Sequence, residues 1–255
     1  MRFPSNKGLT VFGLGVLGVF GALAACGSGS ALPDLSVDGG TTGSPALGGH
    51  TLLTQDQGQG TSPATTAPIT TQARASTVFA LSMGFNRNFL TPTDSFDNRW
   101  SLIGEQNPYA GDQFYTAMWS VVGAKGGIGH RLSVTKPGDP ADEISLAFVE
   151  VANGSAIKNA VYAYPQAGSP ITPGTVTTDG PATLIAVWGG DGPGLSNTAV
   201  PSDGFQVIDS YLALGPSSGV QVAIAFKQVS AAGTYSLTWT ATPVQGAACY
   251  LIAVE

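Results

Sequence analysis

The feature that most constrains the fold is a pattern of short hydrophobic runs. From Ser76 to Glu255, apolar or alternating runs are separated by Gly, Pro, Asn and Asp. The alternation is clearest in residues 234–240 (TYSLTWT), where every second residue is large and hydrophobic. A period of two places these residues on one face of a strand and the hydroxyl-bearing residues on the other. The pattern predicts an all-β chain, and no run has the 3.6-residue period of an amphipathic helix.

Around a dozen candidate strands follow one another in this region. They are 77–83, 99–104, 114–122, 130–135, 144–151, 160–164, 174–178, 182–188, 205–214, 220–229, 234–240 and 248–254. Many short strands joined by turns are typical of an antiparallel β-sandwich. Residues 76–255 are enough for one such domain with a sizeable core. Within it, Cys249 is expected to be a small buried hydrophobe of the last strand.

The first 25 residues have the organisation of a secretory signal peptide. Arg2 and Lys7 precede an uncharged apolar run, and the run ends in Leu23-Ala24-Ala25-Cys26. This tetrapeptide resembles the lipobox of bacterial lipoproteins, in which an aliphatic residue and two small residues precede a cysteine. The resemblance implies that Cys26 receives a diacylglyceryl group and that a peptidase cleaves before it. The alternative is an ordinary signal peptide that is cut beside Cys26.

The lipobox resemblance implies a chain anchored by lipid outside the cytoplasm. Gly27 follows Cys26 where an inner-membrane retention aspartate would stand, so the implied destination in a Gram-negative organism is the outer membrane or cell surface. Cleavage would leave 8 of the 10 basic residues against 16 acidic ones, a net charge of −8. Such a surface offers no electrostatic footprint for nucleic acid. Lipid on Cys26 also leaves Cys249 without a disulfide partner.

Residues 26–75 have the composition of a flexible linker. They are rich in Gly, Ser, Thr, Pro and Gln and poor in aliphatic residues, so they are expected to bury too little apolar surface to offset the entropy of ordering. A Gly-rich coil of this length spans about 40 Å. His50, inside it, is expected to be solvated. The predicted organisation is a signal peptide (1–25), the lipidated Cys26 with its linker (26–75) and a β-sandwich (76–255).

The order of turns and strand patterns in the predicted sandwich carries a second resemblance. The segments concerned are 76–81, 93–100, 115–119, 126–130, 143–151, 181–184 and the closing strand. In this order they resemble an uncharacterised jelly-roll-like β-sandwich module of secreted bacterial and phage-related proteins. The resemblance implies a fold and no established activity, and it transfers no catalytic residue.

Few residues of the sandwich suggest chemistry. His130 is the only histidine of residues 76–255, and no Gly-x-Ser-x-Gly motif accompanies it, so we expect a surface histidine at a strand edge. Glu150 is expected to face solvent; a half-buried position with a raised pKa would instead suit an acid of glycoside hydrolysis. The Asp-rich turns 94–98 and 138–142 could bind calcium through carboxylates and carbonyls, but they lack the full spacing of a calcium loop, and their residues are also those that any turn requires. We predict no catalytic residue, no metal site and no cofactor.

An aromatic stretch offers a candidate binding site. The aromatic residues between 100 and 119 alternate with amide and carboxylate residues, as in the binding platforms of sugar-binding sandwiches. The candidate ligand-binding residues are Trp100, Tyr109, Asp112 and Trp119. The competing interpretation is that these aromatic side chains fill the core.

Three functions follow, in order of preference. The first is a non-enzymatic lipoprotein that displays its sandwich for a structural, adhesive or assembly role, with envelope or surface proteins as partners. The second is a carbohydrate-binding module that uses the aromatic residues of 100–119. The third is a glycan-active hydrolase that uses Glu150.

Overall fold

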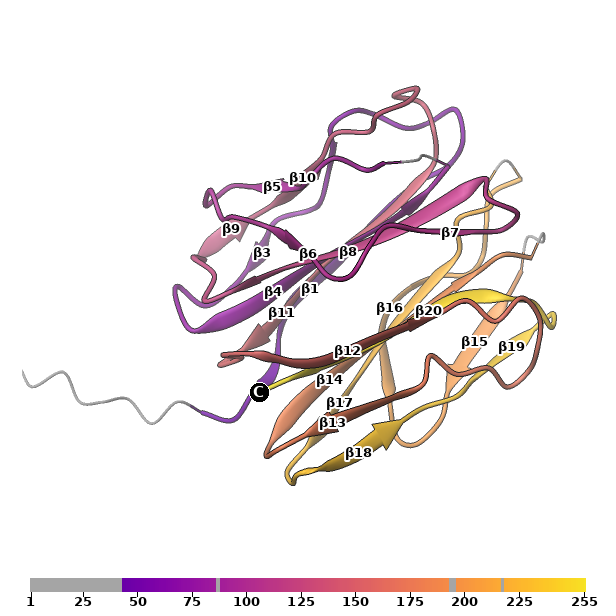
Figure 1. The fold of residues 1–255 in the computed structure, drawn as a ribbon. Coiled ribbons are helices and arrows are strands. Elements are labelled where there is room, and N and C mark those ends of the chain that lie inside the picture. The colour runs from indigo at the N-terminus through magenta and orange to yellow at the C-terminus, as the bar shows by residue number, and fades with distance from the viewer. Residues whose placement is uncertain (1–42, 86–87, 193–195, 217) are drawn as a thin grey trace, which may run out of the picture. The chain divides into compact units, whose positions relative to one another are not determined.

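A computed structural model describes residues 43–85, 88–192, 196–216 and 218–255. These residues form antiparallel β-sheets in several layers (Figure 1). The predicted fold class, an antiparallel jelly-roll-like β-sandwich, is confirmed. Within the described ranges, no helix has the length and apolar character needed to cross a membrane.

The first half of the described chain forms one large sheet and an outer layer. The sheet has the order β1-β11-β4-β8-β6, with β7 beside β8. Its strands are β1 (Ala46–Gln55), β4 (Ser76–Gly84), β6 (Ser101–Leu102), β7 (Asn107–Tyr109), β8 (Phe114–Val122) and β11 (Ile144–Ala152). The outer layer consists of β2 (Ala64–Thr65), β3 (Ile69–Thr70), β5 (Thr93–Asp94), β9 (Ile128–His130) and β10 (Leu132–Val134).

The second half is built in the same way. Its large sheet has the order β12-β20-β14-β17-β16. The strands are β12 (Ile157–Ala163), β14 (Ala182–Gly190), β16 (Gln206–Tyr211), β17 (Val222–Val229) and β20 (Ala247–Val254). The outer strands are β13 (Thr175–Thr178), β15 (Thr198–Pro201), β18 (Gly233–Ser236) and β19 (Trp239–Thr242), and they pair as β13 with β18 and β15 with β19.

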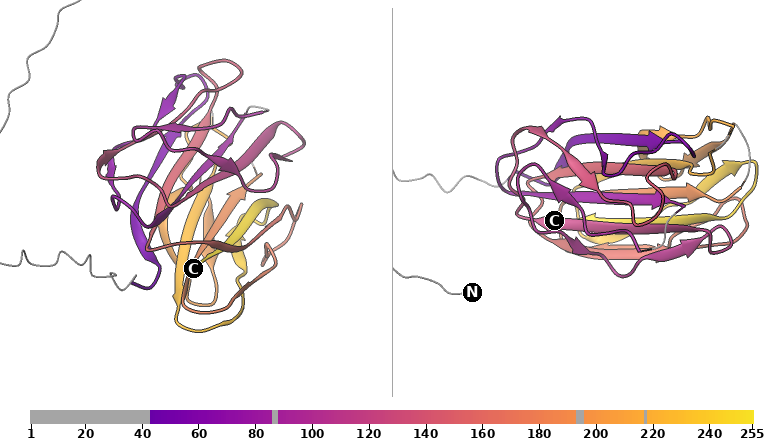
Figure 2. Two further views of the ribbon diagram at one scale, coloured as in Figure 1. Left: turned by 60° about the vertical axis from the view of Figure 1, so that its left-hand side comes forward. Right: turned by 90° about the horizontal axis from the view of Figure 1, so that it is seen from above.

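The two halves repeat one topology. In each half the long strands lie in the order first, last, second, third. This order is β1-β11-β4-β8 in one large sheet and β12-β20-β14-β17 in the other. The outer layers also match, because the pairs β3–β9 and β5–β10 correspond to β13–β18 and β15–β19. This is the Greek-key order of a jelly roll. The predicted single sandwich is therefore two, which we call the N-terminal jelly roll (46–152) and the C-terminal jelly roll (157–254); Figure 2 shows them as two lobes.

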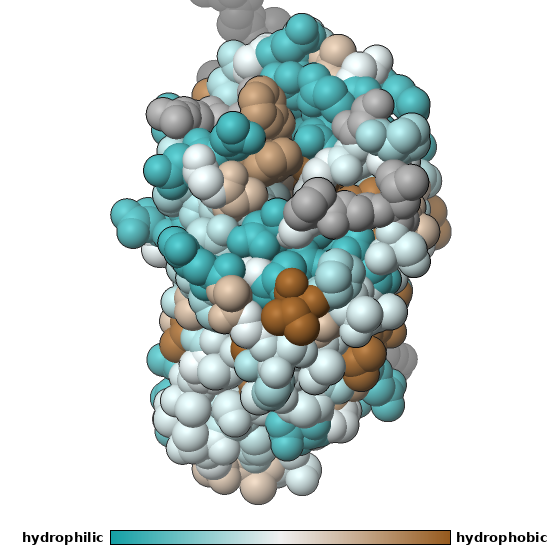
Figure 3. Space-filling model, turned by 90° about the vertical axis from the view of Figure 1, so that its right-hand side faces the viewer, coloured by the Kyte–Doolittle hydropathy of each residue, from teal (hydrophilic) through white to brown (hydrophobic). Residues whose placement is uncertain are grey.

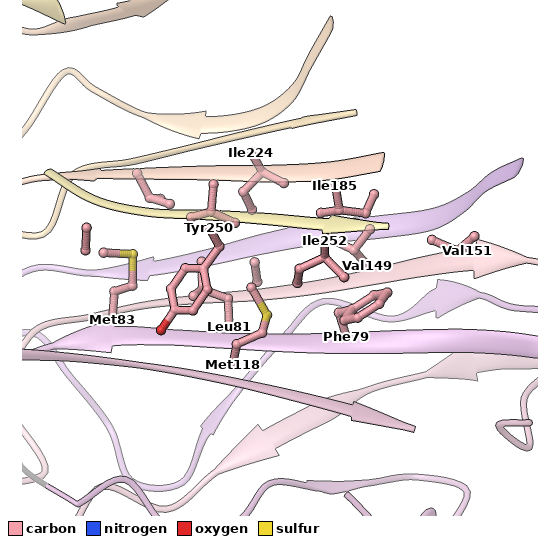
Figure 4. Close-up of a cluster of buried hydrophobic side chains, with 14 of the residues drawn as sticks. Phe79, Leu81, Met83, Met118, Val149, Val151, Ile185, Ile224, Tyr250 and Ile252 are labelled. Carbon is pink, nitrogen blue, oxygen red and sulfur yellow. The ribbon is translucent and has the colours of Figure 1, made fainter. Parts of the chain in front are cut away.

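The two large sheets pack face to face around the central core. Phe79 and Val149 of the N-terminal jelly roll meet Ile185 and Ile252 of the C-terminal jelly roll (Figure 4). Two further clusters fill the space between each large sheet and its outer layer. Each fully buried large aliphatic or aromatic side chain contributes roughly 1.5–3 kcal/mol. The shared central core therefore holds the jelly rolls together as one unit.

The predicted boundary at Ser76 is wrong, because the N-terminal jelly roll begins inside the predicted linker. Strand β1 pairs with β11 along its length, from Ala46 to Gln55. A register shift falls at Gly48 and Gly49, where a Cβ atom would lie 2.3 Å from the Glu150 carboxylate and 2.4 Å from a backbone oxygen, respectively. The glycines that suggested a linker are thus required for close packing. The predicted linker is left with residues 26–42, which lie outside the described residues.

The ends of the long strands define two opposite ends of the molecule. At the proximal end the described chain begins and β1 starts opposite Ala152, close to the C-terminal Glu255, whose carbonyl accepts hydrogen bonds from residues 155 and 156. At the distal end β1 finishes at Gln55, opposite Ile144. Ten residues of strand separate the two ends by about 33 Å.

Candidate functional site

The predicted aromatic platform does not exist, because its aromatic members belong to the core. Trp100, Tyr109 and Trp119 are buried, and Trp100 donates its Nε1–H to Asp94 at 2.7 Å. Asp112 is exposed in the loop before β8. Large aromatic side chains on or beside a strand of a closed sandwich face inward because that face removes most of their surface from water. The prediction that these four residues bind a ligand is therefore wrong for the three aromatic residues.

Glu150 is buried, contrary to the solvent-facing position expected. The residue is 2% exposed, and its carboxylate accepts hydrogen bonds from the backbone N–H groups of Gly49 (3.1 Å) and Gln72 (2.6 Å). Both donors belong to the segment predicted as linker. Glu150 therefore fastens that segment to the sheet, and its carboxylate is committed to a structural role.

His130 is also buried, so the predicted surface position is wrong. Its Nδ1 lies 2.8 Å from Thr71 Oγ1, and its Nε2 lies 3.3 Å from Asp94 Oδ1. The rings of Phe96 and Phe148 pack against it edge-on. A hydroxyl, an imidazole and a carboxylate follow one another as in a nucleophilic triad, but all three groups are buried. These contacts join segments of the outer layer, the ring of Phe148 sets His130 against the sheet, and no reactive atom is presented to solvent.

The Asp-rich turns use their carboxylates as hydrogen-bond acceptors within the protein. Asp94 accepts the backbone N–H of Phe96 at 2.8 Å, and Asp139 accepts that of Ala141 at 2.9 Å. Asp142 accepts hydrogen bonds from Gln57 and from the backbone of Asp139. The bonds from Phe96 and Ala141 are the local hydrogen bonds of Asx turns, whereas Asp142 also holds the distant Gln57. In the part of the chain that the structure describes, no group of three or more His, Cys, Asp or Glu residues is arranged to hold a metal ion.

A cleft at the distal end is the best candidate for a functional site. It has a volume of about 280 Å³ and is lined by Gln57, Phe85, Gln113, Phe114 and Glu143. The Phe85 and Phe114 rings meet edge to face at 5.6 Å, and Phe85 remains 44% exposed. Figure 3 faces this end and shows hydrophobic side chains gathered among hydrophilic ones. The cleft thus combines two aromatic rings with two amides and a carboxyl group.

Glu143 is the chemically distinctive residue of this cleft. It belongs to the N-terminal jelly roll, and its carboxylate accepts hydrogen bonds from Ser218 Oγ (3.0 Å) and from the backbone N–H of Gly219 (2.7 Å), both in the C-terminal jelly roll. Burial raises the pKa of its carboxyl group, these hydrogen bonds oppose the rise, and the negative charge of Asp56 adds to it. Asp56 in turn accepts a hydrogen bond from Tyr211. The residue places an acid with a raised pKa at the junction of the two jelly rolls.

The corresponding end of the C-terminal jelly roll is closed by its own side chains. Gln221 and Gln245 are both buried, and their side chains are joined by a hydrogen bond of 2.8 Å. Both also bind the backbone of Gly192, at 2.7 Å each. Equivalent ends of one repeated fold are therefore filled in one copy and hollow in the other, which indicates that the cleft does not follow from the fold itself.

None of the four predicted ligand-binding residues lines this cleft, although some lining residues are neighbours of predicted features. Gln113 and Phe114 lie in the aromatic stretch singled out above, and Glu143 lies beside the Asp-rich turn 138–142. Gln57 lies in the predicted linker, and Phe85 follows β4 in a connection. No periodic pattern joins these positions; they meet because four strand ends converge at the distal end.

The lining residues of the cleft favour an uncharged polar ligand. Among the described residues that line it, none carries a positive charge, and the amides and the carboxyl group offer hydrogen-bond donors and acceptors beside apolar rings. This combination suits a polar molecule with an apolar face. Comparison with protein-family models, curated proteins and solved structures finds no match for the chain.

Proposed function

We propose that this chain is an extracytoplasmic lipoprotein, held to a membrane by lipid on Cys26, that displays the double jelly roll as a non-enzymatic binding module. The observation that carries the proposal is the placement of the cleft. The chain enters the jelly rolls at the proximal end, whereas the cleft lies at the distal end, about 33 Å away along β1. A tether at residue 43 therefore leaves the cleft on the side turned away from the membrane.

The revised linker sharpens this picture. Residues 26–42, which include the lipidated cysteine, precede the first described residue, Gly43. In the proposed arrangement the proximal end is the end of the jelly rolls that is joined to the anchor. The proposed role is adhesion or assembly, with an envelope or surface molecule bound at the distal end.

Lipid attachment is tested by membrane fractionation. The Cys26→Ser variant should move from the membrane to the soluble fraction, because the anchor is lost. Cys249→Ser is the matched control and should stay with the membrane, since that thiol is buried. Membrane association of Cys26→Ser equal to that of the unmodified protein would refute the anchor.

The orientation is tested by quenching with labelled lipid headgroups. A fluorophore is attached to a cysteine introduced at Ser155 of the proximal end or at Gln113 of the distal end. We expect strong quenching from the first position and weak quenching from the second. Equal quenching at both positions would contradict the proposed display.

Carbohydrate binding is the second candidate function, and it moves from the predicted platform to the distal cleft. The observation in its favour is the pairing of the exposed ring of Phe85 with the amides of Gln57 and Gln113. Full-length protein on a glycan array should bind a neutral glycan, and Phe85→Ala and Gln113→Ala should each weaken the signal. Val244→Ala, an exposed position in the other jelly roll, is the control. Absence of binding to every glycan would eliminate this candidate.

A further inference from the structure

We infer that the seam between the two jelly rolls holds a second binding site, built for an uncharged, hydroxyl-bearing ring such as one unit of a neutral glycan. The site is a groove of about 240 Å³ between β12 and the segment 103–107 that joins β6 to β7. Figure 1 shows β12 at the edge of its sheet, facing the side of β6 and β7. The groove is separate from the distal cleft, and the inference does not depend on the proposed function.

The two jelly rolls also meet along a second, opposite seam, between β1 and β16. The repeat shows which residues of the two seams are equivalent. Strands β4 and β14 have equal length and hold the same position in their sheets, so Phe79 corresponds to Ile185. Phe79 pairs with Val149 of β11, which pairs on its other side with His50 of β1. In the same way, Ile185 pairs with Ile252 of β20, which pairs on its other side with Ala160 of β12. His50 and Ala160 are therefore equivalent.

The facing side of each seam follows from the same comparison. Met118 of β8 corresponds to Ile224 of β17. Asp209 of β16 pairs with Ile224, while the N–H of Ile103 donates to the carbonyl of Met118 at 2.7 Å. Asp209 therefore corresponds to Ile103.

This correspondence explains why one seam is closed and the other is hollow. On the closed seam, His50 Nδ1 lies 2.8 Å from Asp209 Oδ2, so the two side chains bridge the sheets. On the open seam the equivalent positions are Ala160 and Ile103, whose apolar side chains cannot form such a hydrogen-bonded bridge. The groove thus lies at the place where a hydrogen-bonded His–Asp pair bridges the sheets in the other seam.

The floor of the groove carries polar groups suited to a hydroxylated ligand. The rings of Tyr162 and Tyr250 lie 4.8 Å apart and are tilted by 50°. Tyr162 Oη is buried and has no hydrogen-bond partner among the described residues, a costly state that a turn of the ring toward a ligand hydroxyl in the groove would relieve. Asn107 donates to Tyr250 Oη at 3.5 Å, and Glu105 lies at the exposed rim. Burial raises the pKa of Tyr162, so its hydroxyl stays protonated and able to donate.

The same lining defines the ligand class. Ile103, Ala160 and Val161 add apolar surface for the C–H face of a ring, and the lining includes no Lys, Arg or His that would attract an anion. Pockets for drug-sized ligands occupy about 300 Å³ or more, so a groove of about 240 Å³ suits a single ring unit of a longer chain. An uncharged sugar unit has this size, one apolar face and hydroxyl groups at its edge.

The experiment transplants the closed seam into the open one. The double variant Ala160→His with Ile103→Asp places the His–Asp pair of the closed seam across the groove and should block it. Binding of glucose, mannose, galactose and N-acetylglucosamine oligomers to full-length protein in detergent micelles is measured by calorimetry and saturation-transfer NMR. We expect at least one series to bind, the double variant to abolish that binding and Tyr162→Phe to weaken it about five-fold.

Controls separate this site from the rest of the molecule. Tyr211→Phe on the closed seam and Val244→Ala should leave binding unchanged. Failure of every oligomer to bind at millimolar concentration would overturn the inference. It would also be overturned if the double variant and Tyr162→Phe both bound as tightly as the unmodified protein. Loss of binding with Gln113→Ala alone would assign the ligand to the distal cleft, and binding of choline in place of sugars would overturn the ligand class. If thermal unfolding shows that the double variant misfolds, Ala160→Leu replaces it.

Discussion

Truncating Glu150 should destabilise the protein by about 3 kcal/mol. Its buried carboxylate accepts two hydrogen bonds, from the backbone of Gly49 and of Gln72. A hydrogen bond to a charged group contributes about 1.5–3 kcal/mol. Both donors are half-buried, so water can replace part of the loss, and we take the lower limit for each bond. For a domain of this size the change corresponds to a fall in Tm of about 6–12 °C.

Urea unfolding of the full-length protein, combined with hydrogen exchange, measures this effect. Glu150→Gln keeps one carbonyl acceptor and should lose about half as much stability as Glu150→Ala. The amides of β1 should exchange faster in both variants, while those of β4 should not. The exposed Glu105 supplies the control, since Glu105→Ala should stay within about 0.5 kcal/mol of the wild type. If Glu150→Ala unfolds at the same urea concentration as this control, the argument that Glu150 fastens β1 is wrong.

Three further outcomes are expected. Burial raises the pKa of Glu143 above its ordinary 4.5, so the stability that this group contributes is present below that pH and is lost as the pH rises through the raised value. Glu143→Gln should therefore raise Tm at about pH 7 and change it little near pH 4. An equal effect at both pH values would contradict the assignment. Burial would raise the pKa of Asp94, but hydrogen bonds from His130, Phe96 and Trp100 outweigh burial and lower the pKa below 3.8. The stability from the ionised form is therefore present above that pH and disappears in stronger acid. Asp94→Asn should lower Tm at about pH 6, and in thermal scans the difference from the wild type should shrink toward pH 2. Burial also raises the pKa of the Cys249 thiol, so iodoacetamide should modify it only in urea; rapid labelling of the native protein, read by mass spectrometry, would show that β20 is not buried.

The long strands could be predicted from sequence because their signal is local. The predicted strand 114–122 coincides with β8, the prediction at 77–83 is one residue short of β4 at each end, and that at 144–151 is one residue short of β11 at its end. Their apolar runs are bounded by turn residues, and both faces of each are covered. In residues 234–240 the alternation correctly placed Leu237 and Trp239 in the core, although the segment divides into β18 and β19.

The site depended on contacts between distant residues, which no local pattern records. Gln57 reaches the distal cleft from the turn after β1, and Glu143 reaches it from the position just before β11. Ser218 and Gly219 belong to the other jelly roll. Likewise, the seam groove stays open where Ala160 and Ile103 occupy the positions that His50 and Asp209 bridge in the repeat. Neither site could be located before the strand registers were known.

By itself, the sequence determined the β class, the positions of the long strands and the burial of Cys249, because two-residue periodicity and hydrophobicity act within one strand. It also supplies the basis for the proposed lipid anchor at Cys26. Only the tertiary structure decided that the Gly-rich segment 46–55 is an edge strand, that the chain contains the same jelly roll twice and that Trp100, Tyr109 and Trp119 face the core. The physical reason is that an edge strand and a sheet face acquire their stability from partners far away in the chain, whose register local composition does not encode.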